Sequence, residues 1–304
     1  MLQLFKSTDF NFTGRRYFAF AFSVLLIILT IVSLVVHRGV KYGVDFAGGT
    51  LLELKFSSPI TTANLRSVFR NFSMGSASIQ QFGEGYDFIV RFESEGIAEA
   101  AESTSIKVIE LLKQAIPDNT PEIVRIEIVG PRIGKELQRN AILAILIGIF
   151  GILIYVSIRF DFRLGTAAVI ALIQDVLIAI GFISITRTEI SIPIIAALLT
   201  IVGYSVNNSI VISDRIRENL RKMHKVGFEA IINRSINDTL SRTVLTALST
   251  FVVALMLWIF GAAAIKDFAR IISFGIILGT YSTIFIAAPL VVEWEKRFPS
   301  RRRR

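Results

Sequence analysis

Residues 17–36 read YFAFAFSVLLIILTIVSLVV, a run without a single charged residue. The hydrocarbon core of a bilayer is about 30 Å thick and takes roughly 20 apolar residues in a helix to cross. Five further runs of similar length follow along the chain. The six predicted spans are Tyr17–Val36, Ala141–Ile158, Thr166–Thr186, Ile190–Ile212, Thr243–Ile265 and Phe268–Val292. The sequence therefore predicts an integral membrane protein that crosses the bilayer six times.

Hydrophobic residues make up 53% of the 304 residues, above the roughly 45–50% of soluble domains, and the excess lies in these runs. The first run lacks a small-x-small cleavage site at its end, so we interpret it as a retained anchor and not as a cleavable signal sequence.

The net charge of +9 is distributed in a way that excludes a nucleic-acid partner as its main explanation. With the N-terminus in the cytoplasm, most Lys and Arg fall in cytoplasmic segments, including Arg301 to Arg304. The short outer turns hold only Arg187, Lys266 and nearby Arg270. This bias follows the positive-inside rule and predicts that both termini are cytoplasmic, with the basic tail near anionic membrane lipid.

The chain has no Cys, which excludes disulfides and thiolate-ligated metals. The two histidines, His37 and His224, stand alone at predicted membrane edges, so we expect no metal site and no cofactor. The sequence contains neither HExxH nor GxSxG, so we expect no catalytic residues and no enzyme activity.

Between the first two spans lies the only long polar region, and its pattern is strand, helix, strand, strand, helix, strand. Thr61 and Thr62 predict the cap of the first helix, and Gly83-Glu84-Gly85 predicts a hairpin. The predicted elements are Leu51–Phe56, a helix ending near Asn71, Ala77–Phe82, Tyr86–Phe92, Gly96–Ile116 and Glu122–Val129. This order predicts an α+β ferredoxin-like (βαββαβ) domain on the outer face.

The predicted fold is thus an all-α bundle of six transmembrane helices with an inserted α+β outer domain. The predicted parts are a cytoplasmic N-terminus (1–16), transmembrane helix 1 (17–36), a periplasmic domain (37–137), transmembrane helices 2–6 (138–292) and a basic cytoplasmic tail (293–304). An inner loop is predicted over Ser213–Arg242, with an amphipathic stretch at Phe228–Ile236, and an outer turn at Lys266-Asp267.

Polar residues inside the spans are candidates for function, because a carboxylate at the bilayer centre costs about 2.5–3.5 kcal/mol on insertion scales. Asp175 is the only acid well inside a span. Span four carries a polar face with Tyr204, Ser205, Asn207, Asn208 and Ser209, and Arg242 stands at the start of span five. The alternative for the Asn and Ser residues is interhelical hydrogen bonding, at roughly 0.6 kcal/mol each.

Small residues in span six predict close helix contact. Gly275-x-x-x-Gly279 is the spacing at which two helices approach closely, and we expect it to serve packing.

Four motifs resemble the SecD/SecF family of protein-export membrane proteins, within the resistance-nodulation-division (RND) superfamily. Residues 43–50 read GVDFAGGT, residues 203–219 read GYSVNNSIVISDRIREN, and residues 233–246 read NRSINDTLSRTVLT. In span three, ALIQDVLIAIGF is also similar. The resemblance covers nearly the whole chain, and an outer domain followed by five close spans is similar to one RND half-unit.

The resemblance implies the function of the SecF type: assistance to Sec-dependent preprotein translocation and release on the periplasmic side, driven by the proton-motive force. It implies a multi-pass protein of the bacterial inner membrane. The implied partners are SecD, the SecYEG translocon, further candidates YajC and YidC, unfolded preprotein and membrane lipid.

The resemblance also assigns site residues. The motif residues Gly43, Asp45, Phe46, Gly48 and Gly49 form either a hinge before the outer domain or a tight strand start. Asp214, Arg215 and Arg217 belong to the inner loop after span four.

The implied proton relay pairs an acid at position 208 with Arg242, and Asp175 is expected to be structural or accessory to it. This chain has Asn208 where the family pattern has Asp. An Asn carries no transferable proton near neutral pH, so impaired proton coupling is expected. Either natural variation or a deliberate replacement explains Asn208, and the intact flanking pattern favours replacement.

An alternative function is that of an RND-type proton-driven exporter of small solutes. Such exporters carry the six-span unit twice in one chain, with two large outer loops, which this sequence does not.

Overall fold

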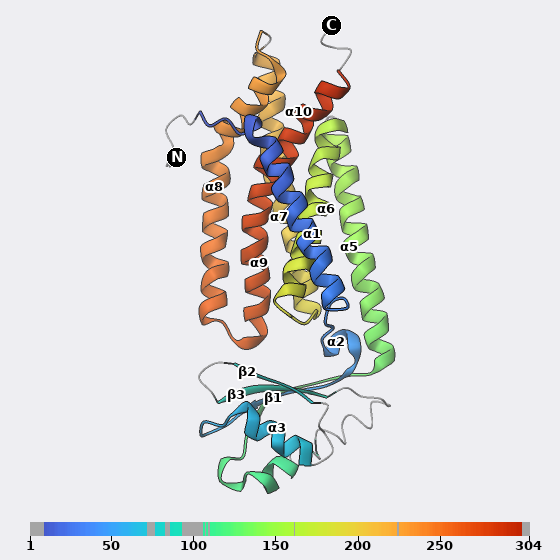
Figure 1. Ribbon diagram of the computed structural model, residues 1–304, viewed down its shortest axis with the longest axis vertical. Coiled ribbons are helices and arrows are strands. Elements are labelled where there is room, and N and C mark those ends of the chain that lie inside the picture. The colour runs from blue at the N-terminus through green and yellow to red at the C-terminus, as the bar shows by residue number, and fades with distance from the viewer. Residues whose placement is uncertain are drawn as a thin grey trace. The chain divides into compact units, whose positions relative to one another are not determined.

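The computed structural model describes residues 9–71, 77–82, 86–92, 106, 108, 110–160, 162–223 and 225–299 (Figure 1). The helical elements are η1 (Thr13–Arg15), α1 (Arg16–Val36), α2 (Val44–Ala47), α3 (Thr62–Asn71), η2 (Pro117–Asn119), α5 (Pro131–Arg159), α6 (Phe162–Ile185), α7 (Ile192–Lys222), α8 (Phe228–Phe260), α9 (Ala263–Ser282), the π-helical η3 (Thr283–Ala287) and α10 (Ala288–Arg297). The strands are β1 (Gly49–Lys55), β2 (Ser78–Phe82), β3 (Asp87–Phe92) and β4 (Glu122–Val129).

Six helices in the described part of the chain are long and apolar enough to cross a membrane, which confirms the predicted number. They are α1 with its preceding η1 turn, α5, α6, α7, α8 and the continuous run from α9 through η3 to α10. A helix satisfies its backbone polar groups internally, as a segment surrounded by lipid must.

The chain divides into two compact units, and each is described by itself. The first, here called the bundle unit, comprises residues 1–40, 144–188 and 193–304. The second, here called the sheet unit, comprises residues 41–143 and 189–192. The short segment 189–192 connects α6 to α7 along the chain, yet it packs within the sheet unit.

In the bundle unit, α6 and the sixth span are the most enclosed helices. In its most apolar stretch each is 67% buried, against 6% for α5. α6 packs against α1, where Gly181 leaves the room that Thr30 occupies. It also packs against α9, where the rings of Phe182 and Phe274 stack with centroids 4.1 Å apart. The apolar side chains of α5 are largely exposed, as expected for a helix that faces lipid or a partner.

The predicted close packing at the two glycines of span six is confirmed. A Cβ atom on Gly275 would lie 2.2 Å from Ile201 Cδ1 of α7, and one on Gly279 would lie 3.4 Å from Ser205 Cβ. The absence of side chains at these positions lets α7 and α9 approach, as small residues do in membrane helix pairs.

The inner loop predicted over Ser213–Arg242 is wrong for most of its length. α7 continues to Lys222 and α8 already begins at Phe228, so the amphipathic stretch forms the first turns of α8. No Gly or Pro lies between 213 and 222, and an ion pair between Glu218 and Lys222, one turn apart, supports the extended helix.

The outer turn is also displaced from its predicted position. α8 ends at Phe260, and the extended backbones of Gly261 and Ala262 make the connection to α9. Lys266 and Asp267 therefore lie inside the first turns of α9. The sequence signal was Gly261, which follows the last apolar residue as a helix end commonly requires.

An ion-pair cluster fastens the start of α1 to two other helices. The side chain of Arg16 is only 7% exposed, and it pairs with Glu229 of α8 over 2.5 Å and with Glu293 of α10 over 2.6 Å. The preceding segment is held by α8, since Phe10 N donates to Asn237 Oδ1 over 2.9 Å.

The sheet unit contains a four-stranded antiparallel sheet in the order β2-β3-β1-β4. This order, with β1 and β3 in the centre and β2 and β4 at the edges, confirms the predicted ferredoxin-like arrangement. β1 lies centrally, with Leu52 opposite Val90 of β3 and Ile126 of β4. Helical residues at 106, 108 and 110–115 belong to the second predicted helix. Residues 96–105 and the predicted hairpin at 83–85 lie outside the described residues.

One face of the sheet forms the core of this unit. The side chains of Leu54, Phe88 and Val90 are fully buried on the sheet, and Leu65 and Leu112 cover them from the helical side. The first helix begins as predicted, since Thr61 Oγ1 accepts a hydrogen bond from Asn64 N over 3.2 Å.

Glycines turn the chain from α2 into β1. Gly48 has φ +80° and Gly49 has φ +130°, conformations that a residue with a Cβ rarely adopts. Gly134 also leaves room for the motif, because a Cβ there would lie 2.8 Å from the Phe46 carbonyl oxygen. These contacts explain the strand start, and the hinge role of the motif stays a prediction.

The sheet-unit core yields a stability prediction. Leu54→Ala should destabilise this unit by about 2–5 kcal/mol, because it removes a fully buried side chain from β1. Hydrogen exchange of the β1 and β3 amides in the full chain measures the loss. Val124→Ala, at a β4 position that is 54% exposed, is the control and should change stability by less than about 0.5 kcal/mol. Equal protection in both variants would contradict this core.

Candidate functional site

A buried carboxylate forms the centre of a polar cluster in the bundle unit. The side chain of Asp175 on α6 is 0% exposed. Ser205 Oγ of α7 donates to Asp175 Oδ2 over 2.7 Å, and Ser282 Oγ at the end of α9 donates to the same oxygen over 2.6 Å. The other oxygen, Oδ1, has no hydrogen-bond partner among the described residues. Hydroxyl groups from two other spans thus hold the acid of span three.

Protonation would change the charge of the Asp175 carboxyl group and its capacity to donate a hydrogen bond. No ion pair within the described part of the chain includes Asp175. An ionised carboxylate only accepts hydrogen bonds, whereas a protonated one gains an O–H donor. A proton can be added at Oδ1 without displacing either serine.

The predicted polar face of span four is only partly turned inward. Ser205, Asn208 and Ser209 are buried, Tyr204 is half-buried and Asn207 is exposed. Ser205 and Asn208 are three residues apart and share one face of α7. The structure therefore unites Ser205 with Asp175 and separates Asn207 from the cluster.

The structure does not join the two residues of the expected relay. Asn208 is 2% exposed, and its Nδ2 has no partner among the residues described. Arg242 on α8 is exposed and belongs to none of the ion pairs found in the described ranges. Its neighbour Thr243 is buried instead, and Thr243 Oγ1 also lacks a partner there.

α1 contributes to the cluster, which sequence reasoning missed. Gln174 Nε2 donates to Ser23 Oγ over 3.1 Å, and Ser23 also exchanges a hydrogen bond of 3.1 Å with the Tyr281 hydroxyl. Tyr281 donates in turn to the Ala19 carbonyl oxygen over 2.8 Å. The sequence signal for this contribution was Ser23 itself, a serine within the long apolar run of the first span.

Ser282 was also missed, and it stands where the sixth span departs from α-helical geometry. The five residues Thr283–Ala287 form a π-helix, a rare segment that frequently occurs at functional sites. The Gly279 carbonyl oxygen accepts a hydrogen bond from Thr283 Oγ1 over 2.7 Å and lies 3.2 Å from Ser282 Oγ, whose hydrogen is donated to Asp175. The signal was the run of hydroxyl residues Tyr281-Ser282-Thr283 after Gly279.

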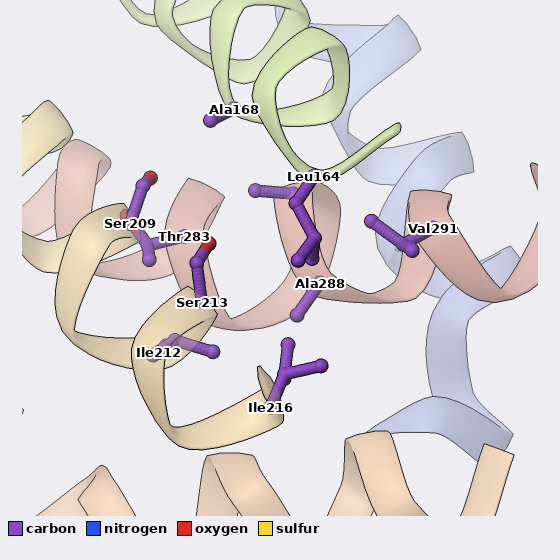
Figure 2. A pocket seen from close by; sticks show the side chains of 10 residues that line it. Leu164, Ala168, Ser209, Ile212, Ser213, Ile216, Thr283, Ala288 and Val291 are labelled. Carbon is purple, nitrogen blue, oxygen red and sulfur yellow. The ribbon is translucent and has the colours of Figure 1, made fainter. Parts of the chain in front are cut away.

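A small cavity lies between α6, α7 and the η3–α10 segment, and two of its lining residues, Ser209 and Thr283, follow Ser205 and Ser282 along their helices (Figure 2). The space that a water-sized sphere can occupy is about 10 Å³, which is close to what one water molecule needs. Ser209, Ser213 and Thr283 supply its hydroxyl groups, and the oxygens of Ser209 and Thr283 are 3.5 Å apart. Leu164, Ala168, Ile212, Ile216, Ala287, Ala288 and Val291 line the rest.

The three residues predicted in the inner loop lie on the last turns of α7 instead. Arg215 pairs with Asp238 of α8 over 2.8 Å and with Glu218 over 2.7 Å. Asp214 lies 3.5 Å from Arg159 of α5, and Arg217 is exposed. These contacts fix the end of α7 to neighbouring helices.

The GVDFAGGT motif binds the start of α7 within the sheet unit. Asp45 Oδ2 accepts a hydrogen bond of 2.7 Å from Ile192 N, the first residue of α7. Gly43 N donates to the Ile190 carbonyl oxygen over 2.8 Å, and a Cβ on Gly43 would lie 3.1 Å from that oxygen. Asp45 thus acts as a helix cap supplied from a distant part of the chain.

Ion pairs reinforce this attachment. Glu189 immediately precedes Ile190, the residue that Gly43 of the motif contacts. Glu189 pairs with Lys41 over 2.5 Å and with Arg91 of β3 over 2.8 Å. The connection between α6 and α7 is therefore bound to the sheet as well as to the motif.

Comparisons with known proteins place these features in a family. Residues 107–297 match the C-terminal model of the protein export membrane proteins SecD/SecF, and residues 33–60 match the SecD/SecF GG motif. The chain is 41% identical over 286 residues to a protein translocase subunit SecF of Rickettsia bellii, covering 93% of this chain and 92% of the relative. It is 40% identical to the SecF subunit of Gemmatimonas aurantiaca, covering 98% and 91%.

The fold is similar to that of solved SecDF proteins. The translocon-associated membrane protein SecDF from Thermus thermophilus matches with a TM-score of 0.85 and 38% identity over 95% of this chain. SecDF in its super-membrane-facing form matches with a TM-score of 0.69 over 98%. The chain spans 39% and 40% of the lengths of these two SecDF chains.

The cap on α7 yields a prediction. Asp45→Ala should weaken the start of α7 by about 1 kcal/mol, because Ile192 N loses its acceptor. Amide exchange of Ile192 and Ile194 should then become roughly fivefold faster in the full chain. Asp45→Asn keeps an acceptor oxygen and should restore most of the protection. Unchanged exchange in the Ala variant would show that Asp45 does not cap the helix.

Proposed function

This chain belongs to the SecD/SecF family of protein export membrane proteins, and we propose that it acts as the SecF subunit of a SecD–SecF complex. In this role it assists preprotein translocation across the bacterial inner membrane. The observation that carries the proposal is the match to SecDF over 95% of the chain at a TM-score of 0.85.

The partners follow from this role. The chain spans 39% of the Thermus SecDF chain, and a SecD-type partner would supply the matching remainder. Unfolded preprotein on the periplasmic side and the Sec translocon are the further partners we propose, with YajC and YidC as additional candidates. α5 offers an exposed apolar surface for lipid or a partner span.

We propose an orientation with both termini in the cytoplasm and the sheet unit in the periplasm. The distribution of Lys and Arg supports it, since cationic residues concentrate at the ends that would be cytoplasmic. The same reasoning supports the division into a cytoplasmic N-terminus (1–16), first span (17–36), periplasmic domain (37–137), further spans (138–292) and basic tail (293–304).

We further propose that the complex uses the proton-motive force. One charge moving across 100 mV supplies about 2.3 kcal/mol, enough to shift a two-state protein several-fold in population. The relay proposed for the family pattern needs an acid at position 208 opposite Arg242, and this chain has Asn208. The absence of an acid there predicts weakened coupling at that position.

A deletion strain tests the export function. Loss of the chain should slow periplasmic release of preproteins, and a plasmid copy should restore it. Normal export combined with hypersensitivity to small toxic compounds would instead assign the chain to solute export.

The relay position yields a separate prediction. Asn208→Asp should raise the proton-motive-force-dependent part of preprotein release several-fold, because it restores a titratable group on the buried face of α7. Release from vesicles with an imposed proton gradient measures it. The matched control is Asn207→Asp, at the exposed neighbouring position, and should have no effect. Equal responses of the two variants would argue against a relay at position 208.

A further inference from the structure

We propose that Asp175 is the proton-binding group of this chain and that the cavity beside Ser209 and Ser213 is its route to water. This inference deepens the proposed function, since it assigns the proton to span three. The evidence is the geometry around one carboxyl group and the hydroxyl groups that lead away from it.

The first argument is the incomplete hydrogen bonding of the carboxyl. Both serine hydroxyls donate to Asp175 Oδ2, at 2.7 Å and 2.6 Å, and Oδ1 has no partner in the described part of the chain. A purely structural carboxylate would have both oxygens occupied, because an unpaired buried acceptor is costly. An oxygen left open in a fully buried site is where a proton can bind and leave.

The second argument is the isolation of this charge. On α6 the nearest other charged residue in sequence is Arg163, and α7 carries none from Ile192 to Ser213. The sixth span has none between Arg270 and Glu293, and α1 has only Arg16. The other titratable groups on these helices within the same stretches are Tyr17, which binds Glu293, Tyr204, and Tyr281, which is engaged with Ser23. Protonation of Asp175 therefore removes the central charge of the bundle.

The third argument is that the hydroxyl residues next in position to the two Asp175-binding serines line a cavity. Ser209 follows Ser205 by one turn of α7, and Thr283 follows Ser282, so each serine that binds Asp175 has a hydroxyl neighbour at the cavity. Figure 2 shows Ser209, Thr283 and Ser213 around this space. The cavity has room for about one water molecule, which can relay a proton between hydroxyl groups.

The chemical step is simple. A proton adds to one carboxyl oxygen of Asp175 and neutralises its single negative charge, and the reverse step returns it to water. A protonated Asp175 becomes a donor at Oδ1, and the loss of its charge weakens the hydrogen bonds that Ser205 of α7 and Ser282 beside the π-helix donate to Oδ2. The π-helical segment η3 is the place where the sixth span can absorb such a change.

Infrared difference spectroscopy on the full chain, assembled with its SecD partner in lipid, tests the proposal. A protonated carboxyl gives a C=O stretching band apart from the ionised form, and we expect a band that appears and disappears as pH is varied over about pH 4–9. Asp175→Asn should abolish this band and the proton-driven part of preprotein release. Asp214→Asn, at a partly exposed acid of the same bundle, should leave the band in place.

A second variant covers the case in which Asp175→Asn does not assemble. Ser282→Ala removes one donor to Oδ2, so the band should shift in frequency if it belongs to Asp175. Ser213→Val, which removes a cavity hydroxyl and fills the space, should slow the protonation several-fold without removing the band.

Three results would overturn the proposal: no band that depends on Asp175, a band that Ser282→Ala leaves unchanged, or a site that responds to sodium and not to pH. If the band behaves as expected while deletion of the chain leaves export normal, the proton site stands and the export role is the part that fails.

Discussion

Burial of polar groups in a low-dielectric bundle is the constraint on which the organisation of this protein depends. An unsatisfied polar group in a membrane span costs several kcal/mol, so a polar side chain inside the bundle is stabilised by pairing with a group on its own or another helix. The hydroxyl groups around Asp175 meet this requirement, and in doing so they tie α6, α7 and α9 together. The glycines of the sixth span then allow the close approach that these hydrogen bonds need.

Local patterns were sufficient for much of the fold. Long apolar runs predicted six spans, and alternation with turn residues predicted the four strands in their ferredoxin-like order. The helix ends were harder to predict. Polarity suggested that α7 stops near Ser213, but without Gly or Pro the helix continues beyond the apolar stretch to Lys222.

The site was predictable in composition and less so in geometry. An acid in a span and a polar helix face can be recognised from the sequence alone, and Asp175 and Ser205, which were recognised in this way, both belong to the cluster. Ser282 and Ser23 could not be chosen from many similar serines, because only the packing of distant helices selects them. Arg242 is exposed on α8 beside the buried Thr243, and its position in the sequence at the start of span five does not reveal this orientation.

The buried Arg16 has a consequence for how the chain is made. Its two acidic partners, Glu229 and Glu293, come late in the sequence. Asn237, which accepts the hydrogen bond from Phe10 N, also comes late. The segment at the start of α1 therefore completes its native contacts only after α10, at the end of the sixth span, has been synthesised. A chain that lacks α10 keeps Glu229 of α8 as a partner of Arg16 but loses Glu293, so one of the two ion pairs at this buried guanidinium is missing. The full ion-pair cluster at the start of α1 therefore needs the last helix of the chain.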